Sequence, residues 1–106
     1  VGQMTKSLTI EGIPGTFALH HNYPNPFNPI TIIEYDIPNE SDVHLVIYDI
    51  LGRQVRTLVN DYQEPGYKSI KWNGTNDQGR LVGAGMYFYH LQTGKFSKVR
   101  KMILLK

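Results

Sequence analysis

The chain contains no cysteine among its 106 residues. A disulfide framework, a thiolate metal site and a cysteine nucleophile are therefore excluded. It also lacks a run of about 20 apolar residues, the length that a membrane-spanning helix needs. Its length corresponds to one domain with a single hydrophobic core.

Acidic residues are missing from the last twelve positions. These positions carry five of the eleven basic residues, Lys95, Lys98, Arg100, Lys101 and Lys106, although the net charge of the chain is only +2. Two interpretations remain open: a basic edge strand that discourages sheet-to-sheet aggregation, or a docking surface for an acidic partner. The modest charge, and aromatic residues that lie mostly elsewhere, argue against a nucleic-acid partner.

Residue patterns typical of an active site are also lacking. His20 and His21 are adjacent and would face opposite sides of a strand, whereas His44 and His90 are isolated within strands. The carboxylates are scattered, and we expect no enzyme, no cofactor and no metal. The loop from Asn73 to Asp77 offers oxygen ligands for weak calcium binding, but turn-forming asparagines explain its composition better.

What the sequence does contain is a series of short alternating segments separated by turn residues, with no sustained helical period. About seven strands in roughly ninety residues predict an all-β fold, an antiparallel sandwich. We place Trp72 at the centre of its core, and we expect a bulge in the last strand between Val99 and Met102. The residues expected to face inward are Ile33, Tyr35, Ile37, Val43, Leu45, Ile47, Val55, Leu58, Ile70, Trp72, Tyr87, Tyr89, Leu91, Met102 and Leu104.

Glycines mark two of the sharper backbone positions. The turn Asp49-Ile50-Leu51-Gly52 predicts a hairpin in which Gly52 adopts left-handed geometry. Gly85 is expected to adopt a positive φ or to approach a neighbouring strand closely.

The segment Asn22-Tyr23-Pro24-Asn25-Pro26-Phe27-Asn28-Pro29 is the most distinctive part of the chain. Its three prolines exclude a helix and favour extended geometry. We expect the aromatic side chains of Tyr23 and Phe27 to plug the open end of the sandwich, with the prolines holding an irregular edge segment.

Four segments together resemble a known family. They are the Pro-Asn-Pro-Phe segment, Val43 to Val59 with its Leu-Gly-Arg turn, Gly66 to Leu91 with Trp72-Asn73-Gly74 and Gly85-Met86-Tyr87, and the closing strand Lys101 to Lys106. This order is similar to that of the C-terminal sorting domains of the type IX (Por) secretion system, which are related in fold to the immunoglobulin-like domain of flagellar hook-capping proteins. The resemblance spans Phe17 to Lys106, and its departures are small (Asn73 for the more usual Asp, Ala84 for Ser).

The resemblance implies an immunoglobulin-like β-sandwich at residues 17–106, with residues 1–16 as a linker or the tail of a preceding domain. It implies a non-catalytic signal that directs an attached cargo protein across the bacterial outer membrane. The implied partners are the outer-membrane secretion machinery and a surface sortase-like peptidase, and the implied location is secreted or at the cell surface, reached through the periplasm. We accordingly expect the chain to come from the C-terminal end of a larger exported protein, with any cleavage near residues 12–16.

Two sets of residues follow from this resemblance. The sorting-recognition residues would be Gly85, Tyr87, Lys98, Arg100, Lys101 and Lys106. The structural motif residues would be Tyr23, Pro24, Pro26, Phe27, Gly52, Trp72 and Gly79.

Three alternatives stay open from the sequence. One is a structural or assembly immunoglobulin-like module, and another is a carbohydrate-binding module that uses Tyr48, Tyr62, Tyr67 and Phe88. The third concerns association: an exposed terminal strand could exchange between copies to give a strand-exchanged homodimer. The sequence does not identify the cargo.

Overall fold

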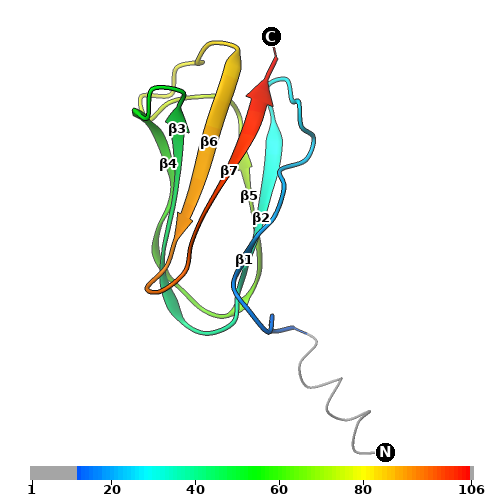
Figure 1. Cartoon of the computed structure of the whole chain (residues 1–106), viewed down its shortest axis with the longest axis vertical. Helices are drawn as coiled ribbons and strands as arrows, with labels where there is room; N and C mark the ends of the chain where they lie inside the picture. Colours follow the sequence, from blue (N-terminus) through cyan, green and yellow to red (C-terminus); the bar gives the residue numbers. More distant parts are fainter. Residues whose placement is uncertain (1–11, 106) are drawn as a thin grey trace, which may run out of the picture.

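The computed structural model describes residues 12–105, which form two antiparallel sheets packed face to face (Figure 1). The first sheet has the order β1-β2-β5 and the second has the order β4-β3-β6-β7. The strands are β1 (Ala18–Leu19), β2 (Thr31–Ile37), β3 (Ser41–Asp49), β4 (Gln54–Gln63), β5 (Gly66–Trp72), β6 (Gly85–Gln92) and β7 (Ser97–Leu104). The predicted all-β, immunoglobulin-like sandwich is confirmed. Across residues 12–105, no helix has the length and apolar character needed to cross a bilayer.

The core lies between the sheets because successive strand residues point to opposite faces. On β3, Val43, Leu45 and Ile47 are fully buried, as predicted. The other strands follow the same alternation, so the two inner faces meet in one core. Its buried members are Leu19, Phe27, Ile33, Tyr35, Ile37, Val43, Leu45, Ile47, Val59, Trp72, Tyr87, Tyr89, Leu91, Met102 and Leu104.

Trp72 occupies the centre of this core, and the prediction for it is confirmed. Its ring centroid lies 5.7 Å from that of Phe27 and 5.5 Å from that of Tyr87, which meets it edge-on. Its indole Nε1 donates a hydrogen bond of 2.8 Å to the carbonyl of Thr75. The one polar atom of the buried ring is therefore satisfied, as a buried indole requires.

Inward positions on β4 and β5 differ from the prediction. Val55, Leu58 and Ile70 are only partly buried, whereas Val59 is the buried residue of β4. The pairing of β3 with β4 shifts register between Leu45 and Val46 and again between Ile47 and Tyr48. Each shift adds a residue to β4 and interrupts its inward phase.

The bulge predicted in the last strand is wrong. β7 pairs with β6 in one continuous register from Gly85↔Leu104 to Gln92↔Ser97. Lys98 and Arg100 share the inward phase of Met102 and Leu104, because their cross-strand partners Leu91 and Tyr89 are buried. The apparent change of phase arises because polar residues occupy this inward-facing row toward the start of β7.

Two glycine turns adopt left-handed geometry, which was predicted for Gly52. Gly52 has φ +83°, and its N–H donates 2.9 Å to the carbonyl of Asp49. Gly79 has φ +82°, and its N–H donates 2.9 Å to the carbonyl of Asn76. An L side chain rarely adopts this conformation, so glycine suits both positions.

Candidate functional site

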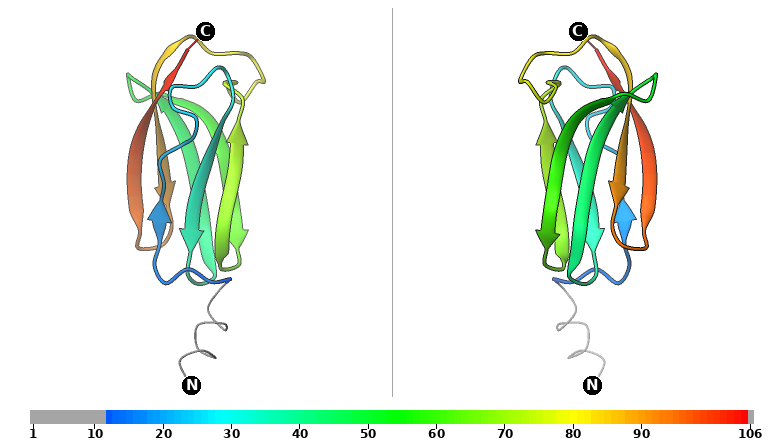
Figure 2. Two further views of the ribbon diagram at one scale, coloured as in Figure 1. Left: turned by 90° about the vertical axis from the view of Figure 1, so that its right-hand side faces the viewer. Right: turned by 90° about the vertical axis from the view of Figure 1, so that its left-hand side faces the viewer.

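The C-terminal half of β7 is covered along its outer edge by the Pro-Asn-Pro-Phe segment. The N–H of Phe27 donates 3.0 Å to the carbonyl of Ile103, and the N–H of Leu105 donates 2.8 Å to the carbonyl of Phe27. The side-chain oxygen of Asn25 accepts the Ile103 N–H at 3.0 Å. Figure 2 shows this segment running beside β7 at one margin of the sandwich.

The two aromatic residues of this segment behave differently. Phe27 is 2% exposed, as predicted for a residue that plugs the sandwich, and it packs against Trp72. Tyr23 is 80% exposed, so the prediction that it helps to plug the sandwich is wrong. The backbone of Tyr23 pairs with Ile32 through hydrogen bonds of 3.0 and 2.9 Å. That bridge places the residue on the ladder of the three-stranded sheet with its side chain in solvent.

The N-terminal half of β7 has an open edge. In an antiparallel ladder, alternate residues turn their backbone N–H and C=O groups away from the partner strand. Because Ile103 turns its groups toward Asn25 and Phe27, the same phase turns those of Ser97, Val99 and Lys101 away from β6. Within residues 12–105, no other segment hydrogen-bonds to the backbone of these three residues. Five residues of edge, about 13 Å, are therefore uncovered in the described chain.

Basic residues surround this open edge in different ways. Lys98 and Lys101 are exposed. Arg100 is half-buried: its Nε donates 2.6 Å to the carbonyl of Leu19, and its Nη1 lies 3.2 Å from Nε2 of His21. Arg100 therefore connects β7 to the end of β1, while the two lysines remain in solvent. Lys106 lies outside the described residues.

A hollow of about 510 Å³ lies against this edge. His21 and Asn25 line it from the segment after β1, and Phe88 lines it from β6. Val99, Arg100 and Lys101 complete the lining. The hollow therefore combines basic groups with the apolar surface of Phe88 and Val99.

Gly85 and Tyr87 lie near the other end of the same hairpin. Gly85 has φ +146° and stands opposite Leu104, which confirms the positive φ expected there. An added Cβ would meet nothing within 4 Å, so backbone conformation rather than close approach favours glycine. Tyr87 is buried, and its hydroxyl donates 2.6 Å to the carbonyl of Gly83. Burial raises the pKa of Tyr87, and the nearby Asp49 carboxylate raises it further.

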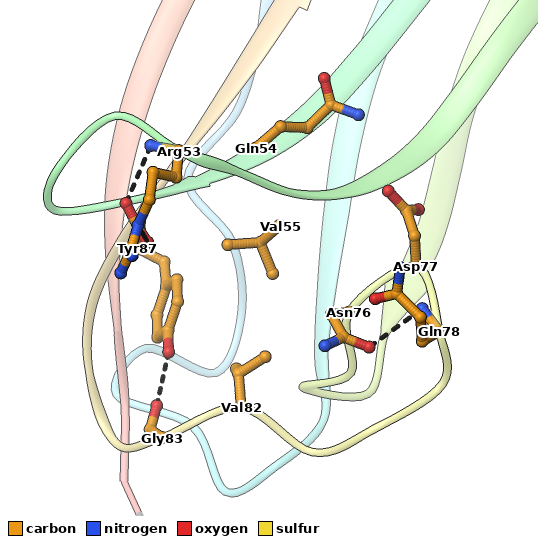
Figure 3. Close-up of a pocket in the computed structure, with 10 residues that line it drawn as sticks. Arg53, Gln54, Val55, Asn76, Asp77, Gln78, Val82, Gly83 and Tyr87 are labelled. Carbon is orange, nitrogen blue, oxygen red and sulfur yellow. Dashed lines mark hydrogen bonds and ion pairs between the residues drawn. The ribbon is translucent and has the colours of Figure 1, made fainter.

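A second hollow, of about 430 Å³, lies between the β3–β4 turn and the loop after β5 (Figure 3). The side-chain oxygens that line it accept hydrogen bonds from backbone N–H groups. The Asn76 side-chain oxygen accepts the N–H groups of Gln78 and Arg80, each at 3.0 Å. An oxygen of Asp77 accepts the Thr57 N–H at 3.0 Å. These bonds favour the turn-forming interpretation of the Asn73–Asp77 loop over calcium binding.

The Asp49 carboxylate, on the rim of this hollow, is similarly engaged. It accepts the backbone N–H groups of Leu51 and Arg53 and, at 2.8 Å, the Nε of Arg53. The hydrogen bond from the Arg53 backbone is the main cause that lowers the pKa of Asp49, and the Arg53 side chain and the Leu51 N–H act in the same direction. The described part of the chain contains no group of three or more His, Cys, Asp or Glu that could hold a metal ion.

The four aromatic residues considered for glycan binding do not gather on one surface. Tyr48 and Phe88 are cross-strand partners on β3 and β6. Tyr62 belongs to β4 and lies at the opposite end of the β3–β4 pair, where its hydroxyl donates 3.1 Å to Glu40. Tyr67 belongs to the other sheet. A planar platform of all four side chains is therefore not formed.

Sequence reasoning missed three residues at the β7 edge: Asn25, His21 and Val99. Asn25 could not be found from sequence periodicity because its hydrogen-bond partner, Ile103, is 78 residues away. The side chains of His20 and His21 were predicted to point to opposite sides of the chain. The structure agrees, since His20 Nε2 pairs with Asp36 at 3.0 Å while His21 lies beside Arg100. Val99 was expected only as the start of a bulge.

Comparison with known proteins places this fold. Residues 30–95 match the model of the FlgD Ig-like domain. The chain belongs to the FlgD Ig-like domain family. This confirms the predicted relation to immunoglobulin-like domains. No curated protein shows significant similarity to the chain.

Three solved structures also resemble this FlgD Ig-like domain in fold. Dimeric latent PorU from Porphyromonas gingivalis superposes with a TM-score of 0.65 at 21% identity, over 87% of this chain and 10% of PorU. PorZ of the same organism, described as an essential bacterial surface component of the type-IX secretion system, gives 0.56 at 22% identity, over 85% of this chain and 11% of PorZ. FlgD from P. aeruginosa gives 0.55 at 24% identity, over 70% of this chain and 58% of that chain. The chain thus spans about a tenth of PorU and PorZ, and at these identities the likeness concerns the fold.

Proposed function

We propose that this domain is a C-terminal sorting signal that directs an attached protein across the bacterial outer membrane to the cell surface, without catalysing a reaction. Support comes from the fold, which is similar to parts of PorU and PorZ, the latter described as a surface component of the type-IX secretion system. Fold alone does not define function, so the proposal depends on a site. The site is β7, which combines a core-anchored half with an open basic half.

The observation that carries the proposal is that one end of β7 is buried in the core and the other end is exposed. Met102 and Leu104 are fully buried and hold the strand in the sandwich. Lys98 and Lys101, only a few residues earlier, are exposed beside uncovered backbone. A strand anchored at one end and accessible at the other can be recognised without unfolding the domain.

The proposed partners are the outer-membrane secretion machinery, a surface sortase-like peptidase and a cargo domain upstream. Recognition would use Lys98 and Lys101, together with Gly85, Tyr87, Arg100 and Lys106. Because Tyr87 is buried and Arg100 bonds to Leu19, these two would act by fixing the shape of the surface. Cleavage would fall near residues 12–16, before β1, and domain bounds of 17–106 remain our assignment.

A reporter fusion tests this proposal. The domain is fused behind a secreted reporter in a host that has the type IX system, and surface display is measured. Lys98→Glu with Lys101→Glu should reduce display strongly, whereas the matched double change Lys68→Glu with Lys71→Glu on β5 of the other sheet should not. Equal display from both variants, with both domains folded by circular dichroism, would contradict the proposal. Sequencing the C-terminus of the mature reporter locates any cleavage.

An assembly module is the second candidate, because the family match is to FlgD and the similarity covers 58% of the FlgD chain. Such a module would remain attached and make subunit contacts. The parent protein decides between the two functions. A sorting signal lies at the C-terminal end of the precursor and is dispensable for cargo folding. An assembly module remains part of the final assembled structure.

A further inference from the structure

The uncovered edge of β7 has the features of a site that binds another strand. Val99 and Lys101 present backbone donors and acceptors that no other segment in residues 12–105 engages. Val99 is 54% exposed, and the hollow beside it is lined partly by Phe88. Binding modules that extend a sheet by one strand use these features: backbone hydrogen bonds give affinity, and pockets for alternate side chains give specificity.

Charge identifies the kind of strand that fits. Lys98 and Lys101 project on opposite faces of β7, so both faces of the edge are basic. Lys95 lies just before the strand, and residues 95–105 contain no acid. Opposite charges on neighbouring strands stabilise their pairing, and like charges directly opposite destabilise it. The edge therefore favours an acidic strand.

The same charges disfavour a second copy of this chain at this edge. Two β7 strands paired antiparallel and edge to edge around Val99 would place Lys98 of each copy opposite Arg100 of the other. A row of edge lysines alone would suffice to prevent such association. The hollow with its apolar lining is an additional feature, which protection against aggregation does not require.

We infer that the open edge of β7, from Ser97 to Lys101, binds an extended acidic peptide segment of a partner protein, which adds to the four-stranded sheet as a fifth strand. The hydrogen bonds would join the partner backbone to Val99 and Lys101. Carboxylates of the partner would lie beside Lys98 and Lys101, and an apolar side chain would enter the hollow against Phe88. This inference rests on the proposed function in one respect, since the secretion machinery would supply the strand.

The test uses the 106-residue chain and a fluorescent, end-capped peptide of about eight residues that places glutamates on both faces of the extended strand and a valine at its centre. Binding is measured by anisotropy, and amide exchange is measured residue by residue. We expect binding that weakens as salt rises. We also expect the amides of Val99 and Lys101 to exchange rapidly in the free protein and to become protected in the complex. A peptide with lysine in place of glutamate should not bind.

Val99→Pro is the decisive variant. It removes the N–H that points away from β6, and proline is tolerated on a strand edge where its N–H would face solvent. Its matched control, Val99→Ala, keeps the N–H. We expect Val99→Pro to weaken peptide binding by about tenfold or more and Val99→Ala to change it by less than about threefold. Lys98→Gln with Lys101→Gln should also weaken binding by about tenfold.

Peptide chemistry supplies a test that does not depend on a protein variant. Methylating the backbone nitrogens of alternate residues should abolish binding in one phase, where the N–H groups face β7, and preserve it in the other. Equal binding by both methylated peptides, or by Val99→Pro and the native chain, would overturn the inference. Polygalacturonate, a polyanion without peptide groups, gives a further test. If it displaced the peptide completely and bound the native chain and Val99→Pro equally well, the site would recognise charge alone and the inference would fail. A stable homodimer that buries this edge would also contradict it.

The binding assay and the export assay can fail separately. If the peptide does not bind while the lysine changes abolish display, the inference fails and the proposed function stands. If the peptide binds as described while the lysine changes leave display intact, the proposed function fails and the strand-binding site stands.

Discussion

β4 and β7 are the two edge strands of one sheet, and another segment of the described chain covers each of them along only part of its length. Along β4, the N–H of Asp77 donates 3.0 Å to the carbonyl of Val55, and the Asp77 carboxylate accepts the Thr57 N–H. One loop residue thereby takes the place of a strand partner at residues 55–57, whereas no hydrogen bond from a loop within residues 12–105 reaches the backbone of residues 58–63. Arg56 of β4 also hydrogen-bonds to the Thr75 hydroxyl, which secures the same loop.

β7 receives comparable cover on its C-terminal half, where Asn25 and Phe27 bond to Ile103 and Leu105. On the remaining half, exposed lysines stand beside the uncovered backbone. Unpaired edges promote unwanted pairing unless they are covered or charged. The comparison teaches that a loop covers one end of each edge strand, and that the open part of β7, unlike that of β4, carries exposed lysines.

Removing the cover from β7 should produce the largest effect. Phe27→Ala deletes a buried ring that packs on Trp72, and we expect it to lower the free energy of unfolding by about 3–5 kcal/mol. Tyr23→Ala, an aromatic truncation four residues earlier, should change it by less than about 0.5 kcal/mol because Tyr23 is exposed. Urea denaturation of both variants checks the difference. Similar losses would mean that the two aromatic residues share one role.

Strain at the start of the terminal hairpin should have the next largest effect. Gly85 pairs with Leu104 on the covered half of β7 and has φ +146°. Gly85→Ala should destabilise the fold by about 1–3 kcal/mol, because an L residue is strained there. Gly83→Ala is the matched control, since Gly83 has no positive φ and open space for a Cβ. Thermal unfolding that ranks Gly83→Ala below Gly85→Ala would contradict this explanation.

The cover of β4 can be weakened in isolation. Asp77→Ala removes the acceptor for the Thr57 N–H and should cost about 1 kcal/mol, in the range of a lost helix cap. It should also accelerate amide exchange at Thr57. Gln78→Ala, in the same loop, should change the free energy of unfolding by less than about 0.5 kcal/mol and should leave amide exchange at Thr57 unchanged. If exchange at Thr57 were insensitive to Asp77→Ala, the carboxylate would not be what protects this edge.

Much of the fold was predictable because its determinants are local. Alternation predicted the inward faces of β2, β3 and β6, and the glycine turn predicted the β3–β4 hairpin. Trp72 was placed correctly because a large apolar side chain in a strand has few alternatives to the core.

The edges were not predictable because their partners are distant in sequence. Tyr23 and Phe27 are both aromatic and lie in one segment, and only the bond between Phe27 and β7 distinguishes them. The register shifts in β4 likewise depend on its pairing with β3, so Val59 could not be chosen over Val55 or Leu58 beforehand. Lys98 and Arg100 follow the inward phase of β7 where charge suggested an outward one.

The smallest effect is expected at the turn that leads into β4. Hydrogen bonds from the Arg53 backbone hold the pKa of Asp49 below its ordinary value of 3.8. Because the folded pKa is the lower one, Asp49 contributes stability above pH 3.8, and this contribution is lost as the pH falls through the folded value. Asp49→Asn should therefore reduce stability at neutral pH and differ less from the native chain in acid. Asp42→Asn, an exposed change on the same strand, is the control. If the difference between Asp49→Asn and the native chain grew on acidification, the ionised carboxylate would not be the form that the turn favours.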